Sequence, residues 1–335
     1  MDRRFVFGTE EKEKFRALMR LQEKFTGCRV ASYCLMCNHF HLLLEVLPMA
    51  EGGLSDEALL KRLSAIDSEA FVAGVAQELA DAKTVAYANE DGLDEAVAAI
   101  HKRLTYRMHD LEFMKGLLQR FTQWLNRAHS RTGRLWEDRF KSLIVEDGVA
   151  AKTISAYIDL NPARAGMVKE PADYRWSSYE EAIGGGSKGN GKTARAGLVR
   201  ALRAHQGVAA DAGLWADGVS REYRKLLMVG AVGKSSESVA RDGKAITKTL
   251  RKGISKEEAE REQDGEVPLG KMLRCRIRYF TDGAVIGSRS FVDEAFAKSR
   301  ERFGAKRKDG ARAMRGSGSG AKGQLWSVRD LRMRI

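Results

Sequence analysis

Two short apolar segments, residues 29–35 and 39–46, are separated by only three residues, "MCN". Both are rich in branched, leucine and aromatic side chains, which is typical of β-strands, and the spacer is long enough only for a tight turn. A helical pattern precedes them over residues 9–25, where Thr9 is a plausible N-cap and apolar side chains recur at helical spacing. A helix followed by a β-hairpin therefore constrains what the rest of the chain must pack against.

Further elements follow the same two periodicities. Residues 54–130 have helical patterns throughout, and Ser55 is a candidate N-cap for the first of them. The segment "RLWEDRFKSLIVED", residues 134–147, reads as another strand. Asp147 can then cap a helix that Pro162 is expected to end, because proline interrupts the hydrogen bonding of a helix interior.

The second half of the chain has weaker patterns. The glycine-rich stretch 184–197 has the composition of a flexible connector. Residues 271–280 alternate basic and apolar side chains, which predicts a strand with one solvent-exposed face. Ser290 is a candidate N-cap for a helix after this strand. The tail over residues 305–335 is basic and glycine-rich, so we expect it to stay mobile until it meets a partner. The predicted organisation is a domain of residues 1–183, the connector 184–197 and a basic extension over residues 198–335.

Charge limits the class of partner. The chain of 335 residues has 58 Lys and Arg against 45 Asp and Glu, a formal net charge of +13. Clustered cations gain free energy by releasing the counterions around phosphates, so nucleic acid is the leading candidate. Four cysteines, no apolar leader and no long apolar run predict a cytoplasmic protein with no disulfide framework and no membrane partner.

The stretch "CLMCNHFHLLLEV" contains the first candidate chemistry, the pair His39 and His41. Alternate residues of a strand point to the same face, so both imidazoles project together while Phe40 and Leu42 face the other way. Two imidazoles suit a borderline divalent metal and leave room for oxygen donors or substrate. The alternative is a pair of partly buried, hydrogen-bonded strand histidines that hold no metal.

The same stretch contains Cys34 and Cys37, spaced C-x-x-C. With the two histidines they supply the residue types of a zinc site. Structural zinc sites, however, normally place their two ligand pairs a dozen or more residues apart so that four ligands can converge as a tetrahedron. The shorter spacing favours packing roles for these two cysteines.

A second constellation lies in "AYIDLNPARAG", where Tyr157 and Asn161 are four residues apart. On one helix this spacing puts a phenol and an amide side by side on the same face, near the helix end that Pro162 defines. The alternative interpretation makes Tyr157 a core aromatic and Asn161 a helix-ending residue.

Four sequence blocks follow one another along the chain: "CLMCNHFHLLLEV", "GRLWEDRFKS", "AYIDLNPARAGMV" and "PADYRWSSY". In this order they resemble the bacterial REP-associated tyrosine transposases, relatives of the single-tyrosine transposases in the HUH endonuclease superfamily. The resemblance covers roughly residues 10–182, and "YFTDGAVIGSR" resembles the C-terminal extension of one subgroup.

The resemblance implies a ferredoxin-like α+β domain, with a central, mainly antiparallel sheet flanked by helices. It implies that His39 and His41 bind Mg²⁺ or Mn²⁺, that Asn161 completes the metal site and that Tyr157 is the nucleophile. The expected activity is that of a single-strand DNA endonuclease and strand transferase. It would cleave hairpin-forming repeats through a 5′-phosphotyrosine, in the nucleoid, as a monomer or as a homodimer that exchanges its tyrosine helices.

DNA contacts are expected near this site. Arg139, Lys141 and Arg164 would contact the DNA backbone, and Trp136 or Trp176 would stack on an unpaired base. For each of them the alternative is an ordinary surface charge or a core aromatic.

The sequence also departs from the family. Members usually begin with a strand, whereas this chain starts almost at its first helix, and only residues 3–7, "RRFVF", could be a remnant of that strand. The start is therefore truncated, the sheet lacks an edge strand or another segment replaces it. Residues 50–112 are a helical insertion, expected to serve DNA recognition or dimerisation. Two other functions stay open: a catalytically silent DNA-binding protein with the same fold, and a zinc-stabilised nucleic-acid-binding module that uses Cys34 and Cys37.

Overall fold

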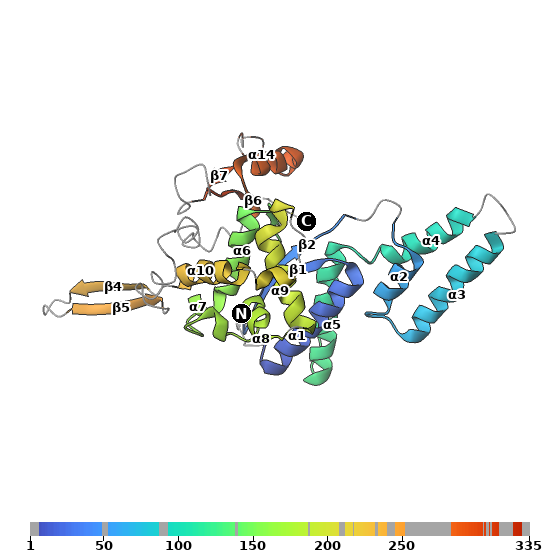
Figure 1. Cartoon of the computed structure of the whole chain (residues 1–335), viewed down its shortest axis with the longest axis horizontal. Helices are drawn as coiled ribbons and strands as arrows, with labels where there is room; N and C mark the ends of the chain where they lie inside the picture. The colour runs from blue at the N-terminus through green and yellow to red at the C-terminus, as the bar shows by residue number, and fades with distance from the viewer. Residues whose placement is uncertain are drawn as a thin grey trace. The chain divides into compact units, whose positions relative to one another are not determined.

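The protein combines helices with small sheets in a computed structural model (Figure 1), which confirms the mixed α+β class. The chain divides into two compact units, Met1–Val30 with Leu44–Phe140 and Ala31–Leu43 with Lys141–Ile335. None of the helices in the described ranges has both the length and the apolar character needed to cross a bilayer. The structure describes residues 7–48, 53–86, 93–137, 140–186, 188–207, 212–216, 218–231, 234–239, 245–251, 283–303, 305, 308, 310–314 and 324–329.

The first unit is built on the packing of α1 (Thr9–Thr26) against α5 (Asp110–Ala128). The aromatic rings of Phe15 and Phe121 meet edge to face at 5.2 Å between centroids, and both are fully buried. The helix predicted over residues 9–25 is therefore confirmed, although its N-cap is Gly8 and not Thr9.

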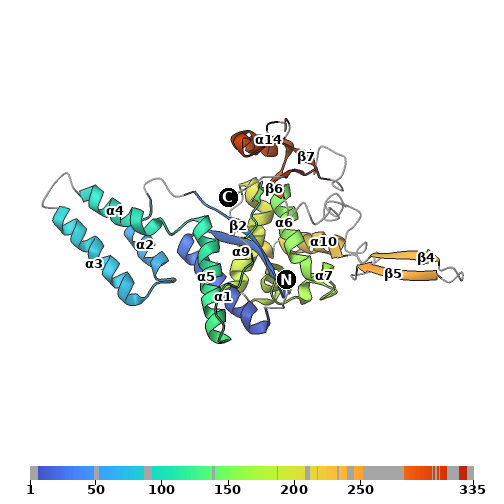
Figure 2. The same cartoon turned by 180° about the vertical axis from the view of Figure 1, so that it is seen from behind.

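Three further helices of this unit enclose a second apolar cluster around Leu59, Leu63 and Leu79. Figure 2 shows them side by side. The predicted cap is confirmed, because the Ser55 hydroxyl accepts a hydrogen bond of 3.2 Å from the Ala58 backbone N–H. These helices make up the predicted helical insertion: α2 (Asp56–Leu63), α3 (Glu69–Ala86) and α4 (Leu93–Thr105).

The predicted hairpin is confirmed as β1 (Arg29–Leu35) paired with β2 (Phe40–Glu45). The Met36 backbone N–H donates to the His39 carbonyl at 2.9 Å and closes the turn. Strand β1 is buried at every residue after the first, whereas β2 is only half-buried. The hairpin thus has one strand in the core and one strand whose side chains are partly accessible to solvent and to ligands.

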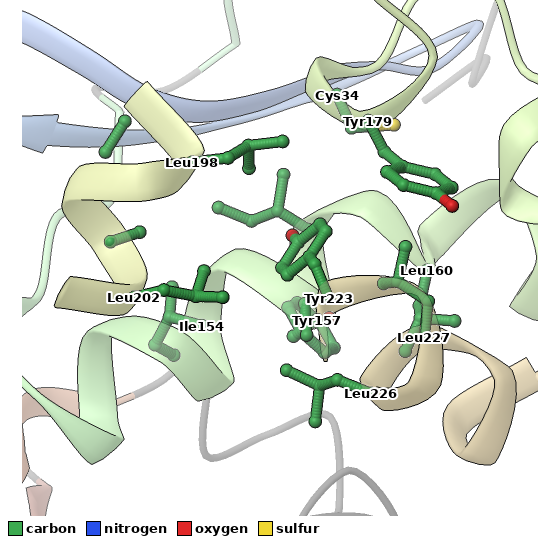
Figure 3. Close-up of a cluster of buried hydrophobic side chains, with 14 of the residues drawn as sticks. Cys34, Ile154, Tyr157, Leu160, Tyr179, Leu198, Leu202, Tyr223, Leu226 and Leu227 are labelled. Atoms are coloured by element: carbon green, nitrogen blue, oxygen red, sulfur yellow. The ribbon is translucent and has the colours of Figure 1, made fainter. Parts of the chain in front are cut away.

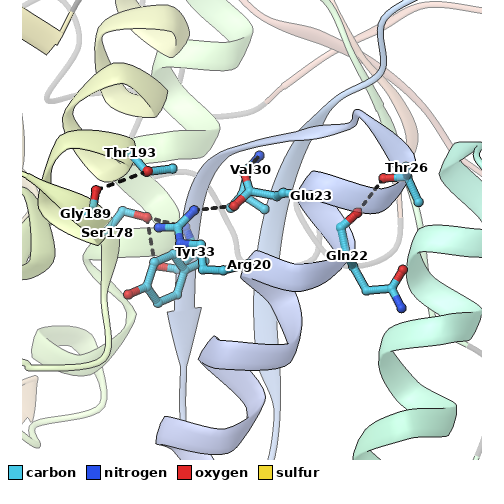
Figure 4. Close-up of polar contacts among 9 residues, drawn as sticks. All are labelled: Arg20, Gln22, Glu23, Thr26, Val30, Tyr33, Ser178, Gly189 and Thr193. Atoms are coloured by element: carbon cyan, nitrogen blue, oxygen red, sulfur yellow. Dashed lines mark hydrogen bonds and ion pairs between the residues drawn. The ribbon is translucent and has the colours of Figure 1, made fainter. Parts of the chain in front are cut away.

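The segment around Ser177 follows the other edge of β1. The Leu35 backbone N–H donates to the Trp176 carbonyl at 2.9 Å, and the Tyr33 N–H donates to the Ser178 hydroxyl at 2.5 Å (Figure 4). The "PADYRWSSY" block therefore completes the backbone hydrogen bonding of a strand that comes much earlier in the sequence.

Helices α6 (Val149–Asp159), α9 (Gly189–Arg203) and α10 (Val219–Ala231) share the main core of the second unit. Figure 3 shows Tyr223 and Leu198 among the side chains that meet there. The core that these helices form includes Tyr157 of α6.

The glycine-rich segment 184–197 differs from its prediction, because it is helical from Gly189 onward. Gly191 is buried in α9, and a Cβ atom there would overlap the carbonyl oxygen of Gly185 at the end of α8 (Ser178–Gly184). The glycines permit a close approach of two backbones, which composition alone cannot distinguish from a flexible linker.

A four-stranded sheet of order β3-β6-β8-β7 includes parts of the predicted mobile tail. Strand β3 (Ile144–Val145) pairs in parallel with β6 (Gly283–Gly287). The apolar face of α14 (Arg289–Lys298) packs on the sheet, and its N-cap is Ser288 and not the predicted Ser290. The tail strands are β7 (Arg312–Ala313) and β8 (Trp326–Arg329).

Several predicted features fall outside the described residues: the strand over residues 271–280, Arg139, and the possible strand remnant over residues 3–7 except Phe7. The remaining elements are α7 (Asn161–Arg164), η1 (Pro171–Asp173), η2 (Ala204–Gln206), η3 (Ala212–Trp215), β4 (Lys234–Val239), β5 (Ala245–Arg251) and η4 (Arg300–Arg302).

Replacing Gly191 with alanine should lower the free energy of unfolding by about 1–3 kcal/mol, because the added methyl group overlaps a backbone carbonyl that cannot move freely. The matched control is Gly74→Ala in α3, where nothing lies within 4 Å of the added carbon. That variant should gain up to about 1 kcal/mol from better helix propensity. Urea denaturation measures both, and a Gly191→Ala protein as stable as the parent would contradict the close packing.

Candidate active site

His39 and His41 lie together at the start of β2, as their spacing predicts. Their ring centroids are 5.1 Å apart in an edge-to-face arrangement. The His39 Nδ1 atom is 2.7 Å from the Asn38 amide oxygen. That oxygen can only accept, so Nδ1 carries the proton and Nε2 keeps its lone pair for a ligand.

Desolvation favours the neutral form of both imidazoles. Burial lowers the pKa of His39 below its usual value. Burial, together with the neighbouring His39, lowers the pKa of His41 to about 4. Both shifts favour the unprotonated ring, which is the form that binds metal ions.

Tyr157 projects from α6 toward this pair. Its ring centroid is 5.9 Å from that of His41, and the guanidinium carbon of Arg164 lies 5.2 Å from the centre of the tyrosine ring. Only 3% of Tyr157 is exposed. Burial raises the pKa of its hydroxyl, and the positive charge of Arg164 partly opposes that rise. The site thus combines a nearby phenol with a low tendency to ionise.

Asn161 is not on the same helix as Tyr157, contrary to the prediction. Helix α6 ends at Asp159, and Asn161 begins the short α7, which has Pro162 in its first turn. Proline is tolerated there because the first backbone N–H groups of a helix have no partner within it. The Asn161 amide nitrogen donates to the carbonyls of Tyr157 at 3.2 Å and Ile158 at 3.3 Å. Its amide oxygen is then the atom it can offer to a cation.

The donor set fits a divalent cation, because two neutral imidazole nitrogens and an amide oxygen are ordinary metal ligands. Across the described ranges no three His, Cys, Asp or Glu side chains gather as a metal site. A site of two histidines and one asparagine contains only two residues of those four types, so it falls outside that description. Cys34 is fully buried, with its sulfur 3.7 Å from that of Met36, so it packs in the core as its spacing suggests.

The residues predicted to contact DNA differ in exposure and in what they pack against. Lys141 is exposed just before β3, and Arg164 covers the Tyr157 ring. Trp176 is half-buried, with its ring 5.8 Å from that of Tyr174. Trp136 belongs to the first unit, where its indole N–H donates to the Thr122 hydroxyl at 2.9 Å. Packing accounts for the position of Trp136, and its stacking on DNA stays a prediction.

Sequence reasoning missed Asp159, which is fully buried two residues after Tyr157. The Tyr223 hydroxyl donates to one of its carboxyl oxygens at 2.7 Å, and the Tyr179 backbone N–H donates to the other at 3.2 Å. Burial raises the pKa of Asp159 to about 7, although these hydrogen bonds oppose the shift. The only sequence signal was a carboxyl group in an otherwise apolar helix segment.

Comparisons of the chain with protein-family models, with curated proteins and with solved structures find no match. The chemistry of the site must therefore be inferred from its own residues and from the resemblance of its motifs.

Asp159 should make stability depend on pH. Its folded-state pKa lies above the ordinary 3.8, so the folded protein holds the proton more tightly than the unfolded chain. The tighter proton binding adds to the free energy of unfolding. This added stability is complete below about pH 4, and it is lost as the pH rises to about 7, by about 1 kcal/mol per pH unit. Relative to wild type, Asp159→Asn should therefore gain stability between about pH 4 and about 7 in urea denaturation. Parallel pH profiles for the two proteins would contradict the raised pKa.

Proposed function

We propose that the protein is a metal-dependent, single-strand DNA endonuclease and strand transferase that cleaves hairpin-forming repeats through a 5′-phosphotyrosine. The observation that carries the proposal is the position of the Tyr157 ring, 5.9 Å from His41, in a chain whose His39 and His41 rings are 5.1 Å apart. Four ordered sequence blocks that resemble REP-associated tyrosine transposases support it. The net charge of +13 supports a DNA partner.

The ferredoxin-like arrangement is part of the proposal. Its support is the succession of α1, the β1–β2 hairpin and the later α6, with the segment around Ser177 bonded along the free edge of β1. A nucleoid location in the cytoplasm, and action as a monomer or a homodimer, belong to the same proposal.

His39, His41 and Asn161 would hold Mg²⁺ or Mn²⁺. A bound divalent cation would supply charge stabilisation for the non-bridging phosphate oxygens, where negative charge develops during attack. The protein contributes two imidazoles whose lowered pKa values favour the neutral, metal-binding form. The edge-to-face packing of the two rings fixes their mutual orientation.

Tyr157 would act as the nucleophile. Its hydroxyl oxygen forms a bond to phosphorus, the bond from phosphorus to the 3′ oxygen breaks, and the proton lost by the phenol is balanced by the proton that the leaving 3′ oxygen takes up to become a hydroxyl. The reverse reaction with another 3′-hydroxyl joins strands with no external energy source. Arg164 favours the phenolate through its charge, which offsets part of the effect of burial.

Tyr157 is only 3% exposed, so the side chains that cover it must move before a DNA phosphate can reach its hydroxyl. Arg164 lies over the ring and is also a predicted contact of the DNA backbone. A phosphate that draws the guanidinium away would uncover the phenol, so that DNA binding and exposure of the nucleophile are coupled in this proposal.

The burial of Tyr157 also favours the second candidate, a catalytically silent DNA-binding protein with the same fold. In that case the tyrosine is a core residue and its raised pKa has no chemical use. The two candidates differ in whether a covalent protein–DNA bond forms.

Incubation with a labelled, hairpin-containing single strand and Mg²⁺ or Mn²⁺ should give a covalent adduct that survives a denaturing gel. Tyr157→Phe should abolish the adduct, because the attacking oxygen is removed. Tyr174→Phe is the matched control: it removes a buried hydroxyl that donates to the Leu35 carbonyl at 2.6 Å, and it should keep the adduct. An adduct in Tyr157→Phe would refute the assigned nucleophile, and absence of cleavage across many hairpins would favour the silent binder.

Metal binding is tested separately from cleavage. His41→Ala should weaken Mn²⁺ binding by at least about tenfold in calorimetry, because a direct ligand is lost. Cys37→Ser should bind Mn²⁺ like the parent, since that half-buried thiol is not in the proposed ligand set. Release of bound zinc by Cys37→Ser, with no effect of His41→Ala on Mn²⁺, would support the zinc-stabilised module instead.

A further inference from the structure

The first unit contains a cavity of about 450 Å³ that plays no part in the proposed cleavage chemistry. It is lined by α1, by residues after α2, by the connection from α4 to α5, and by one side of α5. Its volume falls within the range of about 300–1,000 Å³ that is typical of small-molecule sites. All of its lining residues belong to this one unit.

Gln22 provides a buried amide in the wall of the cavity. The residue is 1% exposed, and its amide oxygen has no hydrogen-bond partner among the described residues. Figure 4 shows its side chain extending from α1 toward α5. Gly116 of α5 leaves the space for it, because a Cβ atom there would lie 2.6 Å from the amide nitrogen. An unpaired buried acceptor is unfavourable, and a ligand that donates a hydrogen bond would relieve it.

Two more amides, those of Gln119 and Gln123, line the cavity from α5. A glutamine amide offers both a donor and an acceptor, and rotation by half a turn exchanges them. Such groups match the edge of a nucleobase, which also presents donors and acceptors side by side.

Aromatic surface lies next to these amides. Tyr106 lines the cavity and is 74% exposed, so the face of its ring is accessible to a ligand. Phe25 is buried beneath, with the guanidinium carbon of Arg107 at 5.3 Å from its ring centre. Exposed aromatic rings are the stacking platforms on which proteins bind unpaired bases.

The charge of the lining suits a phosphate. It includes Arg107, Lys115 and Arg120, with Glu112 as the only acidic side chain in the lining. Glu112 pairs with Lys115 at 2.8 Å, and Arg107 is 3.6 Å from a carboxyl oxygen of Asp67. After these pairs the lining is still positively charged.

We propose that this cavity binds an unpaired nucleotide of single-stranded nucleic acid. The base stacks on Tyr106, its edge bonds to the glutamine amides, and Arg120 and Lys115 hold the flanking phosphates. The site needs neither a metal ion nor Tyr157, so it goes beyond the proposed function and does not rest on it.

The test uses the full chain in EDTA and fluorescently labelled oligonucleotides of about 12 residues that cannot form hairpins, in separate thymidine, adenosine and cytidine versions. Fluorescence anisotropy measures their binding. Tyr106→Ala should weaken binding of the tightest one at least about fivefold, whereas Tyr106→Phe, which keeps the ring, should bind like the parent. Gly116→Ala should also weaken binding, because its methyl group displaces the Gln22 amide.

Phe71→Ala is the matched control, since Phe71 is a 42% exposed aromatic in α3 that does not line the cavity. Equal loss of affinity in Phe71→Ala and Tyr106→Ala would overturn the proposal, and so would absence of binding by all three oligonucleotides. An acidic peptide could instead bind the cavity more tightly than the oligonucleotide and displace it. That result would assign the cavity to a peptide and would also overturn the proposal.

Photo-crosslinking gives a second measurement that needs no variant. An oligonucleotide with 5-iodouracil should crosslink to the peptide that contains Tyr106, identified by mass spectrometry, and crosslinks confined to other segments would refute the site.

Failure of the proposed function can be distinguished from failure of this proposal. Tyr157→Phe should bind these oligonucleotides like the parent, so a protein that binds through Tyr106 but never cleaves would refute only the nuclease.

Discussion

The burial of helix α6 is the constraint on which the rest of the second unit depends. Nearly all of its side chains from Ala150 to Asp159 are buried, because the helix packs against α9 and α10. A helix enclosed in this way must provide partners for its polar groups. The Tyr223 hydroxyl and the Tyr179 backbone N–H provide them for Asp159, and the Ser155 hydroxyl is 3.0 Å from that of Tyr223.

Desolvation also affects the electrostatics of the candidate site. On the hairpin it lowers the pKa of His39 and of His41, which favours metal binding, and in α6 it raises the pKa of Tyr157, which opposes formation of the phenolate. Arg164 is the charged group that acts against this second effect. One physical cause thus prepares the proposed ligands and restrains the proposed nucleophile, which is consistent with a site that becomes reactive only when a substrate changes its surroundings.

Local sequence patterns predicted the elements that need few distant contacts. The helix over residues 9–25 and the hairpin that follows it were predicted with correct types and nearly correct ends, because their apolar periodicity is strong. The segment 184–197 was misread because glycine serves both mobile linkers and close backbone contacts, and only Gly185 opposite Gly191 distinguishes the two. The tail strands β7 and β8 exist through pairing with β6 and with each other, which no local pattern reveals.

The sequence by itself determined which chemical groups are available and how neighbours in the chain are spaced. Alternation along a strand was enough to place His39 and His41 together. Only the tertiary structure decided that His41 meets Tyr157, that Asp159 is enclosed by Tyr223, and that Gln22 lies beside Gly116. The physical reason is that the geometry of the backbone fixes contacts between near neighbours, whereas contacts between distant segments, and the burial that shifts their pKa values, arise only when whole elements pack.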